Sequence, residues 1–119
     1  MYNHMVVETS SEGEVDRLFQ ALADATRRDI VMRVLVSEYS VSGLAEQYAM
    51  SFAAVQKHVA VLERASLVTK EKRGREQIVR GQLDGVQRAR RLLDHYESIW
   101  RQRVDRITDI LAEDVGKQD

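Results

Sequence analysis

The chain has 119 residues, 44% of them apolar and 31% charged, which suits one globular domain rather than a disordered segment. It has no cysteine, which excludes disulfides, thiolate metal sites and cysteine nucleophiles, and no apolar run long enough for a membrane span. The absence of proline and the presence of only six glycines indicate a mainly helical fold with short connections. No signal-peptide pattern begins the sequence, so we expect a cytoplasmic protein.

The net charge of −1 is unevenly distributed along the chain. Residues 1–50 hold four Arg and eight acids, a sum of −4, and residues 92–119 hold four basic and seven acidic residues, a sum of −3. Between them, residues 51–91 hold ten basic and four acidic residues, a sum of +6. Such a basic middle fits a phosphate-binding surface and fits equally an ordinary solvated face.

Two helices are predicted in the first 36 residues. Ser11-Glu12-Gly13-Glu14 is a capping-box pattern that starts the first helix. Its apolar face consists of Val15, Leu18, Phe19 and Leu22. Asp24 is a suitable N-cap for the second helix. The predicted buried face of that helix consists of Ile30, Val31, Val34 and Leu35.

A helix-turn-helix pattern follows. Residues 37–41 break the helical pattern with at most a very short strand, and Ser42 can cap a brief third helix that ends near Tyr48. Ser51 can cap a fourth helix, whose apolar stripe is Val55, Val59 and Leu62. The front end of this helix is small and polar, which suits a recognition helix in the major groove of DNA. Any helical hairpin has similar spacing, so this pattern alone leaves both interpretations open.

A basic hairpin comes directly after the fourth helix. Residues 67–72 and 76–83 can form two strands around the turn Arg73-Gly74-Arg75, where glycine supplies the backbone freedom of a tight turn. Arginines at such a tip can reach phosphates or a narrow minor groove. The alternative is a surface hairpin with solubilising charge. A helix-turn-helix followed by a basic wing favours DNA binding.

One long helix is predicted for residues 84–114. Its apolar residues are spaced three or four apart: Val86, Ala89, Leu93, Tyr96, Trp100, Val104, Ile107 and Leu111. A helix of this length measures ~45 Å, more than a core of ~70 residues can cover. We therefore expect a two-fold dimer in which this helix pairs with its copy, together with Val15, Leu18 and Phe19 of the first helix. The alternatives are a helix folded back on its own domain and, for Trp100, a ligand pocket near the interface.

Three stretches carry a family resemblance: LFQALADATRRDIV, VSGLAEQYAMSFAAVQKHVAVLERASLV and KRGRE. They resemble the ArsR-type winged-helix repressors over residues 15–83. The resemblance implies a dimer that binds a palindromic operator in double-stranded DNA, usually represses its own operon, and is released by a signal such as a small-molecule effector. It also implies DNA contacts for Ser51, Phe52, Ala53, Ala54, Gln56, Lys57 and His58, and for Arg73 and Arg75 at the wing tip. His58 could instead pack at the junction of helix and wing.

The chain departs from the family at several positions. Metal-sensing members carry Cys-x-Cys where this chain has Ser40-Val41-Ser42, and hydroxyls are poor ligands for soft metals. Asp94 and His95 are adjacent rather than spaced as a metal site on the last helix requires. Ser66 replaces the usual glycine, so it could adopt a left-handed conformation, or the helix could end differently. We therefore expect no metal site and no cofactor.

No nucleophile–base pattern and no glycine-rich phosphate loop indicates catalysis, so we do not expect an enzyme. The sequence predicts a single mainly α domain with a small β-hairpin: a winged helix-turn-helix core at 13–83 and a dimerisation helix at 84–114. Residues 1–10 and 115–119 are expected to be flexible tails. The predicted function is a dimeric repressor. The alternatives are a winged helix that docks a protein and a nucleoid-type binder without sequence preference.

Overall fold

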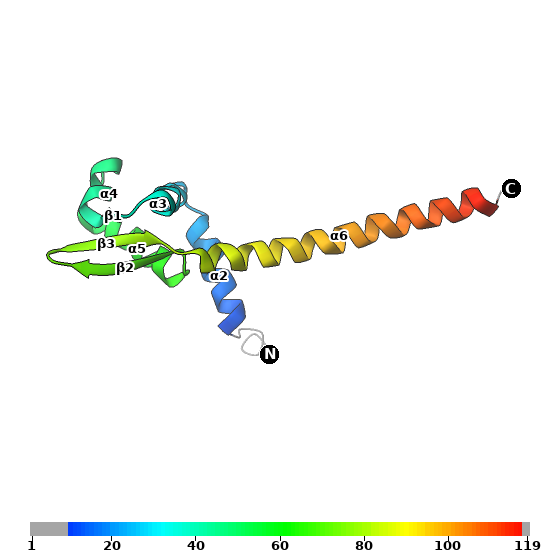
Figure 1. Cartoon of the computed structure of the whole chain (residues 1–119), viewed down its shortest axis with the longest axis horizontal. Coiled ribbons are helices and arrows are strands. Elements are labelled where there is room, and N and C mark those ends of the chain that lie inside the picture. The colour runs from blue at the N-terminus through cyan, green and yellow to red at the C-terminus, as the bar shows by residue number, and fades with distance from the viewer. Residues whose placement is uncertain (1–9, 118–119) are drawn as a thin grey trace, which may run out of the picture. The chain divides into compact units, whose positions relative to one another are not determined.

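The computed structural model describes residues 10–117, which form a mainly helical fold with a small sheet, as the sequence predicts (Figure 1). The chain divides into two compact units, Met1–Ala89 and Arg90–Asp119. The elements are α2 (Ser10–Leu22), α3 (Ala25–Val36), β1 (Tyr39–Ser40), α4 (Val41–Tyr48), α5 (Phe52–Arg64), β2 (Val68–Arg73), β3 (Glu76–Gly81) and α6 (Leu83–Lys117). In the described part of the chain, no helix has both the length and the apolar character of a membrane span.

Local side-chain caps start two of the helices as predicted. The carboxylate of Asp24 accepts the backbone N–H of Arg27 at 3.0 Å and begins α3. The hydroxyl of Ser51 accepts the N–H of Ala54 at 3.1 Å and begins α5. Each cap satisfies a donor that the first helical turn leaves unpaired. Both predicted caps are confirmed.

The caps predicted for the other two short helices are wrong. Helix α4 is capped by Ser40, whose hydroxyl accepts the N–H of Gly43 at 2.9 Å, and not by Ser42. Ser40 pairs with Ile78 in the sheet, which holds its backbone in the extended conformation that an N-cap needs. Helix α2 begins at Ser10, so Ser11 lies inside the helix.

Left-handed residues end both helices of the helix-turn-helix. Helix α4 stops at Ala49, where φ is 49°. Helix α5 ends in a Schellman motif: the N–H of Leu67 donates to Leu62 O at 3.0 Å, and that of Ser66 donates to Glu63 O at 3.0 Å. Ser66 has a φ of 59°, which confirms the left-handed conformation considered for it.

The sheet has the strand order β1-β3-β2, and both pairs are antiparallel. Arg73 pairs with Glu76, which leaves Gly74 and Arg75 as a two-residue turn. Gly74 has a φ of 65°, and positive φ at the first turn residue alone is the pattern of a type II′ hairpin turn. The predicted hairpin is therefore present, and β1 adds a third strand to it.

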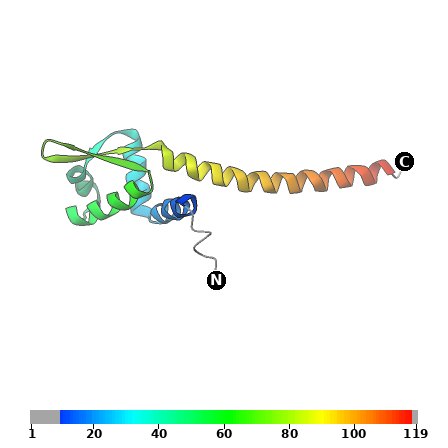
Figure 2. The same cartoon turned by 90° about the horizontal axis from the view of Figure 1, so that it is seen from below.

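The core of the first unit lies between the helices and the sheet: α3, α4 and α5 contact the strands, and α2 packs against α3 and α5. Figure 2 shows the helices of this unit together on one side of the hairpin. Ile30, Val31 and Val34 are buried as predicted. Leu35 is not: it lies against Gly81 at the end of β3 and remains 48% exposed. Leu18 is 1% exposed and belongs to this core, which corrects its assignment to a dimer interface, because no surface of it remains for a partner.

The last helix differs from its predicted limits of 84–114. It begins at Leu83 and ends at Lys117, so residues 115–117, predicted as part of a tail, are helical. Residues 1–9 and 118–119 of the predicted tails lie outside the described residues. In the first turns of α6, the N–H of Gly85 donates to Ser66 O at 2.9 Å. An added Cβ at Gly85 would lie 2.6 Å from Ala65 O, so this close approach requires glycine.

Candidate nucleic-acid interface

The first two turns of α5 present an exposed polar surface. Val55 and Val59 turn into the core, while Gln56 and Lys57 on the other side are exposed. The residues at the helix start, Ser51, Phe52 and Ala53, are also exposed, and Ala54 is half-buried. The chain has no acidic residue from 51 to 62. This end of α5 therefore combines small side chains, hydrogen-bonding groups and a positive charge, which is the chemistry of a helix that reads base edges.

His58 is half-buried and lies close to α3. Its Nδ1 atom is 3.4 Å from Nη1 of Arg27, which also donates to Ala21 O at 2.8 Å and to Gln20 O at 2.9 Å. Arg27 thus joins the end of α2 to the recognition helix. The contact supports a packing role for His58, and its contact with DNA stays a prediction.

A polar cluster holds α4 against α3. The hydroxyl of Tyr48 donates to Asp29 at 2.5 Å, and Arg33 donates to the same carboxylate oxygen at 2.9 Å. The guanidinium of Arg33 also lies 5.4 Å from the centre of the Tyr48 ring. The hydrogen bond from Tyr48 and then that from Arg33 lower the pKa of Asp29, whereas burial and then Asp29 raise the pKa of Tyr48 to about 12. The cluster positions the first helix of the helix-turn-helix.

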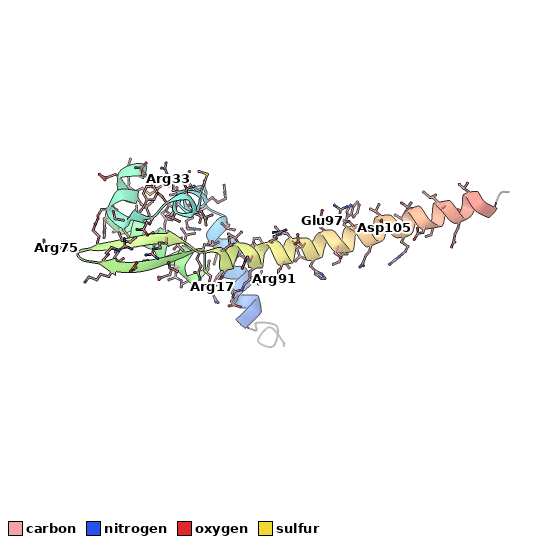
Figure 3. All side chains as sticks on the ribbon, in the orientation of Figure 1. Arg17, Arg33, Arg75, Arg91, Glu97 and Asp105 are labelled. Atoms are coloured by element: carbon pink, nitrogen blue, oxygen red, sulfur yellow. The ribbon has the colours of Figure 1, made fainter. Side chains whose placement is uncertain are left out.

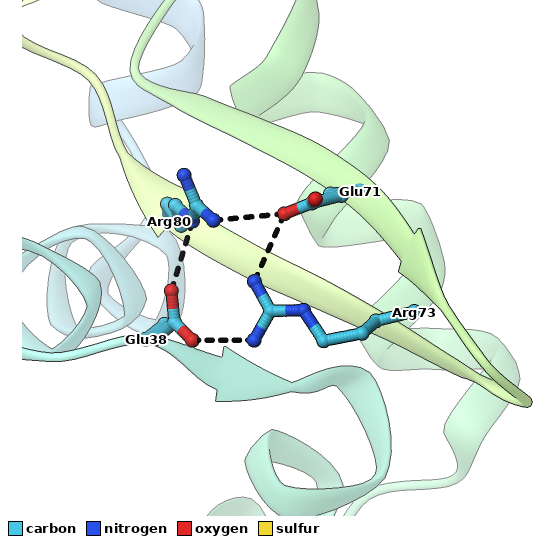
Figure 4. A network of polar contacts seen from close by, with 4 residues as sticks. All are labelled: Glu38, Glu71, Arg73 and Arg80. Carbon is cyan, nitrogen blue, oxygen red and sulfur yellow. Dashed lines mark hydrogen bonds and ion pairs between the residues drawn. The ribbon is translucent and has the colours of Figure 1, made fainter.

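A closed ring of ion pairs lies on the sheet (Figure 4). Arg73 pairs with Glu38 at 2.8 Å and with Glu71 at 3.0 Å, and Arg80 pairs with the same two carboxylates at 2.8 Å each. Hydrogen bonding to Arg73 lowers the pKa of Glu38. The ring joins both strands of the hairpin to the residue before β1, so it fixes the direction of the wing.

The two wing arginines have different surroundings. Arg75 is exposed in the turn and stands at the far tip of the hairpin (Figure 3). Arg73, at the end of β2, has its guanidinium between two carboxylates. Arg75 is therefore better placed to meet a phosphate, and contact of Arg73 with DNA would require it to leave the ring.

No family model matches the chain. It is 37% identical over 81 residues to the HTH-type transcriptional regulator Rv2034 of Mycobacterium tuberculosis, which is 68% of this chain and 76% of that protein. Its fold matches the ArsR-like transcriptional regulator from Rhodococcus sp. RHA1 with a TM-score of 0.76 and 29% identity, over 87% of this chain and 95% of that one. The chain belongs to the ArsR family of winged-helix transcriptional regulators.

A third similarity concerns the fold alone. The winged helix-turn-helix DNA-binding domain of Mb0332 from Mycobacterium bovis, described as homodimeric, matches with a TM-score of 0.60 and 22% identity, over 86% of this chain and 92% of that one. The resemblance seen in the sequence is thus confirmed: this is a transcriptional regulator with a winged helix-turn-helix DNA-binding fold.

The residues that the sequence assigned to a dimer of this ArsR-family regulator lie in both units. In the first unit, Val15 is half-buried and Phe19 is 37% exposed. In the second unit, α6 exposes the predicted apolar stripe: Leu93, Tyr96, Trp100, Val104, Ile107 and Leu111. Ile99, Ile110 and Val115 are exposed as well. An exposed apolar stripe of this length is typical of an interaction surface.

The segment Ser40-Val41-Ser42, which stands where the resemblance places Cys-x-Cys, has a structural role in this chain: Ser40 caps α4 and Val41 is buried. Among the described residues, no group of three or more His, Asp or Glu side chains is arranged to hold a metal ion.

The ion-pair ring and the Tyr48 cluster were missed by the sequence reasoning. Part of the ring could have been found from the hairpin register. Glu71 and Arg73 alternate onto one face of β2, and the pairing of Thr69 with Arg80 places Arg80 diagonally opposite Glu71. Glu38 gives no such local indication, because it lies 35 residues from Arg73 in the chain.

Proposed function

We propose that this regulator is a homodimeric repressor that reads a palindromic operator with the start of α5 and contacts the flanking backbone with Arg75. Binding of an operator in its own promoter, as the family resemblance implies, would make the repression autoregulatory. The observation that carries the proposal is the exposed, acid-free surface formed by Ser51, Gln56 and Lys57 at the capped end of α5.

Each exposed side chain of this surface has a distinct task. Gln56 can donate and accept in the same plane, as bidentate recognition of adenine requires. Lys57 is a point charge that suits a phosphate. The small side chains of Ala53 and Ala54 let the helix backbone approach the groove. Phe52, 47% exposed, offers an apolar contact of the kind that a thymine methyl accepts.

The exposed stripe on α6 supports dimerisation through this helix, as does the homodimer described for Mb0332. A two-fold dimer presents two copies of α5 to successive major grooves on one side of the duplex. The half-sites are then expected one helical turn apart, a separation of ~34 Å. This geometry predicts a palindromic operator.

Binding selection from a random DNA pool tests the proposal, followed by anisotropy titrations of the selected duplex. Gln56→Ala should lose ~1–3 kcal/mol on the selected site and relax the preference at one position in each half-site. Lys57→Ala and Arg75→Ala should weaken all sequences alike and reduce the slope of log affinity against log salt by about 1 each. Glu113→Gln, at an exposed position of α6 that is not part of the reading surface, is the control and should bind as the wild type does.

Four results would contradict the proposal or a part of it. Selection of a motif without two-fold symmetry would contradict the dimeric reading geometry. Strong retention of DNA without any motif would indicate a nucleoid-type binder, and no retention at all would direct the search to a protein partner. A Gln56→Ala variant that binds the selected and random duplexes as the wild type does would remove the base-reading role of Gln56.

A further inference from the structure

We propose that a pocket between α2, α3 and α5 binds a small anionic molecule and that its occupancy weakens DNA binding; the second half rests on the function proposed above. The pocket has a volume of about 330 Å³ and is lined by Arg17, Gln20, Arg27, Val61 and Arg64. This volume lies within the range of small-molecule sites, at its lower end.

The pocket is lined by positive charge alone. Three guanidinium groups surround the space, and no carboxylate lines it. Among the side chains that the structure describes, those of residues 13–116, none of the three forms an ion pair, whereas Arg33, Arg80 and Arg88 each pair with a carboxylate. Like charges around a concave surface repel each other until an anion enters. The site therefore favours a ligand that carries two or more negative charges.

The guanidinium group also selects the chemistry of the ligand. Its parallel N–H groups match the oxygens of a carboxylate or a phosphate, which it binds with two hydrogen bonds. The amide of Gln20 can add a polar contact, and Val61 offers a small apolar one. Small di- or tricarboxylates and phosphate esters are the metabolites that combine this charge with this size.

The side chain of Arg27 is held in place at the pocket. Nε donates to Ala21 O at 2.8 Å, Nη2 donates to Gln20 O at 2.9 Å, and Nη1 lies 3.4 Å from His58 Nδ1. These contacts use three of the five N–H groups of a guanidinium, so two remain for an anion. Because the carbonyls at the end of α2 fix the side chain, binding costs little of its conformational entropy.

The position of the pocket argues against a DNA phosphate as its occupant. Val61 and Arg64 belong to the last turns of α5, whereas the reading surface extends from Ser51 to Lys57. Arg64 follows Lys57 by seven residues of helix, a distance of ~10 Å along the axis. A hollow this far from the reading end suits a free molecule better than the backbone of the duplex that α5 reads.

Arg27 connects the pocket to DNA binding. It lines the pocket and also contacts His58 on the recognition helix. A multivalent anion bound there lowers the positive charge of the DNA-binding unit. It also competes for the guanidinium of Arg27, which joins α2 to α5 through its contact with His58. Both effects weaken DNA binding, and by thermodynamic linkage bound DNA weakens anion binding by the same factor.

Titration of the full chain with citrate and with inorganic phosphate tests the site, with binding measured by calorimetry without DNA. Ionic strength is held constant with chloride. The pocket variant is Arg17→Gln with Arg64→Gln, because neither forms an ion pair with another described side chain, those of residues 13–116. The matched control is Arg91→Gln with Arg106→Gln, which removes the same charge from exposed positions that do not line the pocket.

We expect the pocket variant to bind the anions about tenfold more weakly or worse, and the control variant to bind as the wild type does. Millimolar anion should lower the DNA affinity of the wild type, relative to chloride at equal ionic strength, but not that of the pocket variant.

Equal anion affinity in all three proteins would overturn the site. A pocket variant that loses DNA affinity and salt slope in chloride alone, beyond the control, would show that the arginines bind DNA phosphate instead. Anion binding without any effect on DNA affinity would overturn the regulatory half. If the wild type binds no DNA in chloride, the proposed function fails, while the titration without DNA still decides the site.

Discussion

Replacing Ser66 by glycine should stabilise the protein. Ser66 closes α5 with a φ of 59°, a conformation that crowds the Cβ of any residue except glycine. The bonds that form the turn come from the backbone: Leu67 N–H to Leu62 O, Ser66 N–H to Glu63 O, and Gly85 N–H to Ser66 O. Glycine keeps all three. In the described residues, the Ser66 hydroxyl makes no hydrogen bond that the change would remove.

Two terms set the size of the effect. Relief of the left-handed strain is worth about 1–2 kcal/mol. Against it, glycine loses about 0.5–1 kcal/mol more backbone entropy on folding. The midpoints of the two ranges give a net stabilisation of about 0.75 kcal/mol for Ser66→Gly, and the melting temperature should rise by about 2–5 °C in a chain of this size.

Thermal unfolding followed by circular dichroism measures this shift. Protein concentration must be held fixed, because association makes the melting temperature depend on it. Ser37→Gly is the matched control: φ at Ser37 is −155°, so no strain is relieved and the entropy term alone should lower the melting temperature. A Ser66→Gly variant that melts at or below the wild-type temperature would refute the strain assigned to this turn.

Three further predictions concern Gly85, Asp24 and Glu38. Gly85→Ala should destabilise the fold by about 1–3 kcal/mol in urea titrations, because its Cβ would lie 2.6 Å from Ala65 O, whereas Gly116→Ala, with no atom within 4 Å, should not. The N–H of Arg27 lowers the pKa of Asp24 below 3.8, so this stabilisation is complete above about pH 4 and is lost as the pH falls through the lowered pKa. Between pH 5 and pH 2 the melting temperature of Asp24→Asn should therefore fall less than that of the wild type, because asparagine keeps a cap that does not titrate. An equal fall in both proteins would contradict the contribution assigned to the Asp24 carboxylate. Glu38→Gln removes one carboxylate from the ring around Arg73 and Arg80, so DNA affinity at low salt should rise and the salt slope should steepen by about 1. An unchanged salt slope in the anisotropy titration would mean that Arg73 and Arg80 do not contribute to DNA binding.

Features that depend on a few neighbouring residues were predictable. The caps at Asp24 and Ser51 and the left-handed Ser66 each involve bonds across three to five residues. The order of the elements follows from apolar periodicity, which is also local. The family's helix-turn-helix and wing could be located for the same reason, since α4, α5 and the hairpin follow one another in the chain.

Sheet pairing and packing decided the rest. Ser40 rather than Ser42 caps α4, because pairing with Ile78 holds Ser40 extended. Leu18 looked like an interface residue because periodicity identifies an apolar face without saying what covers it, and α2 buries that residue in the core.

The charged groups show the same division most clearly. The sequence determined that residues 51–91 are basic, but not which arginines are neutralised. Glu38 reaches Arg73 across 35 residues, while Arg17, Arg27 and Arg64 come from three helices to one pocket without a carboxylate. Charge interactions depend on distance in space, so only the tertiary structure could separate the paired arginines from those that remain available for a ligand.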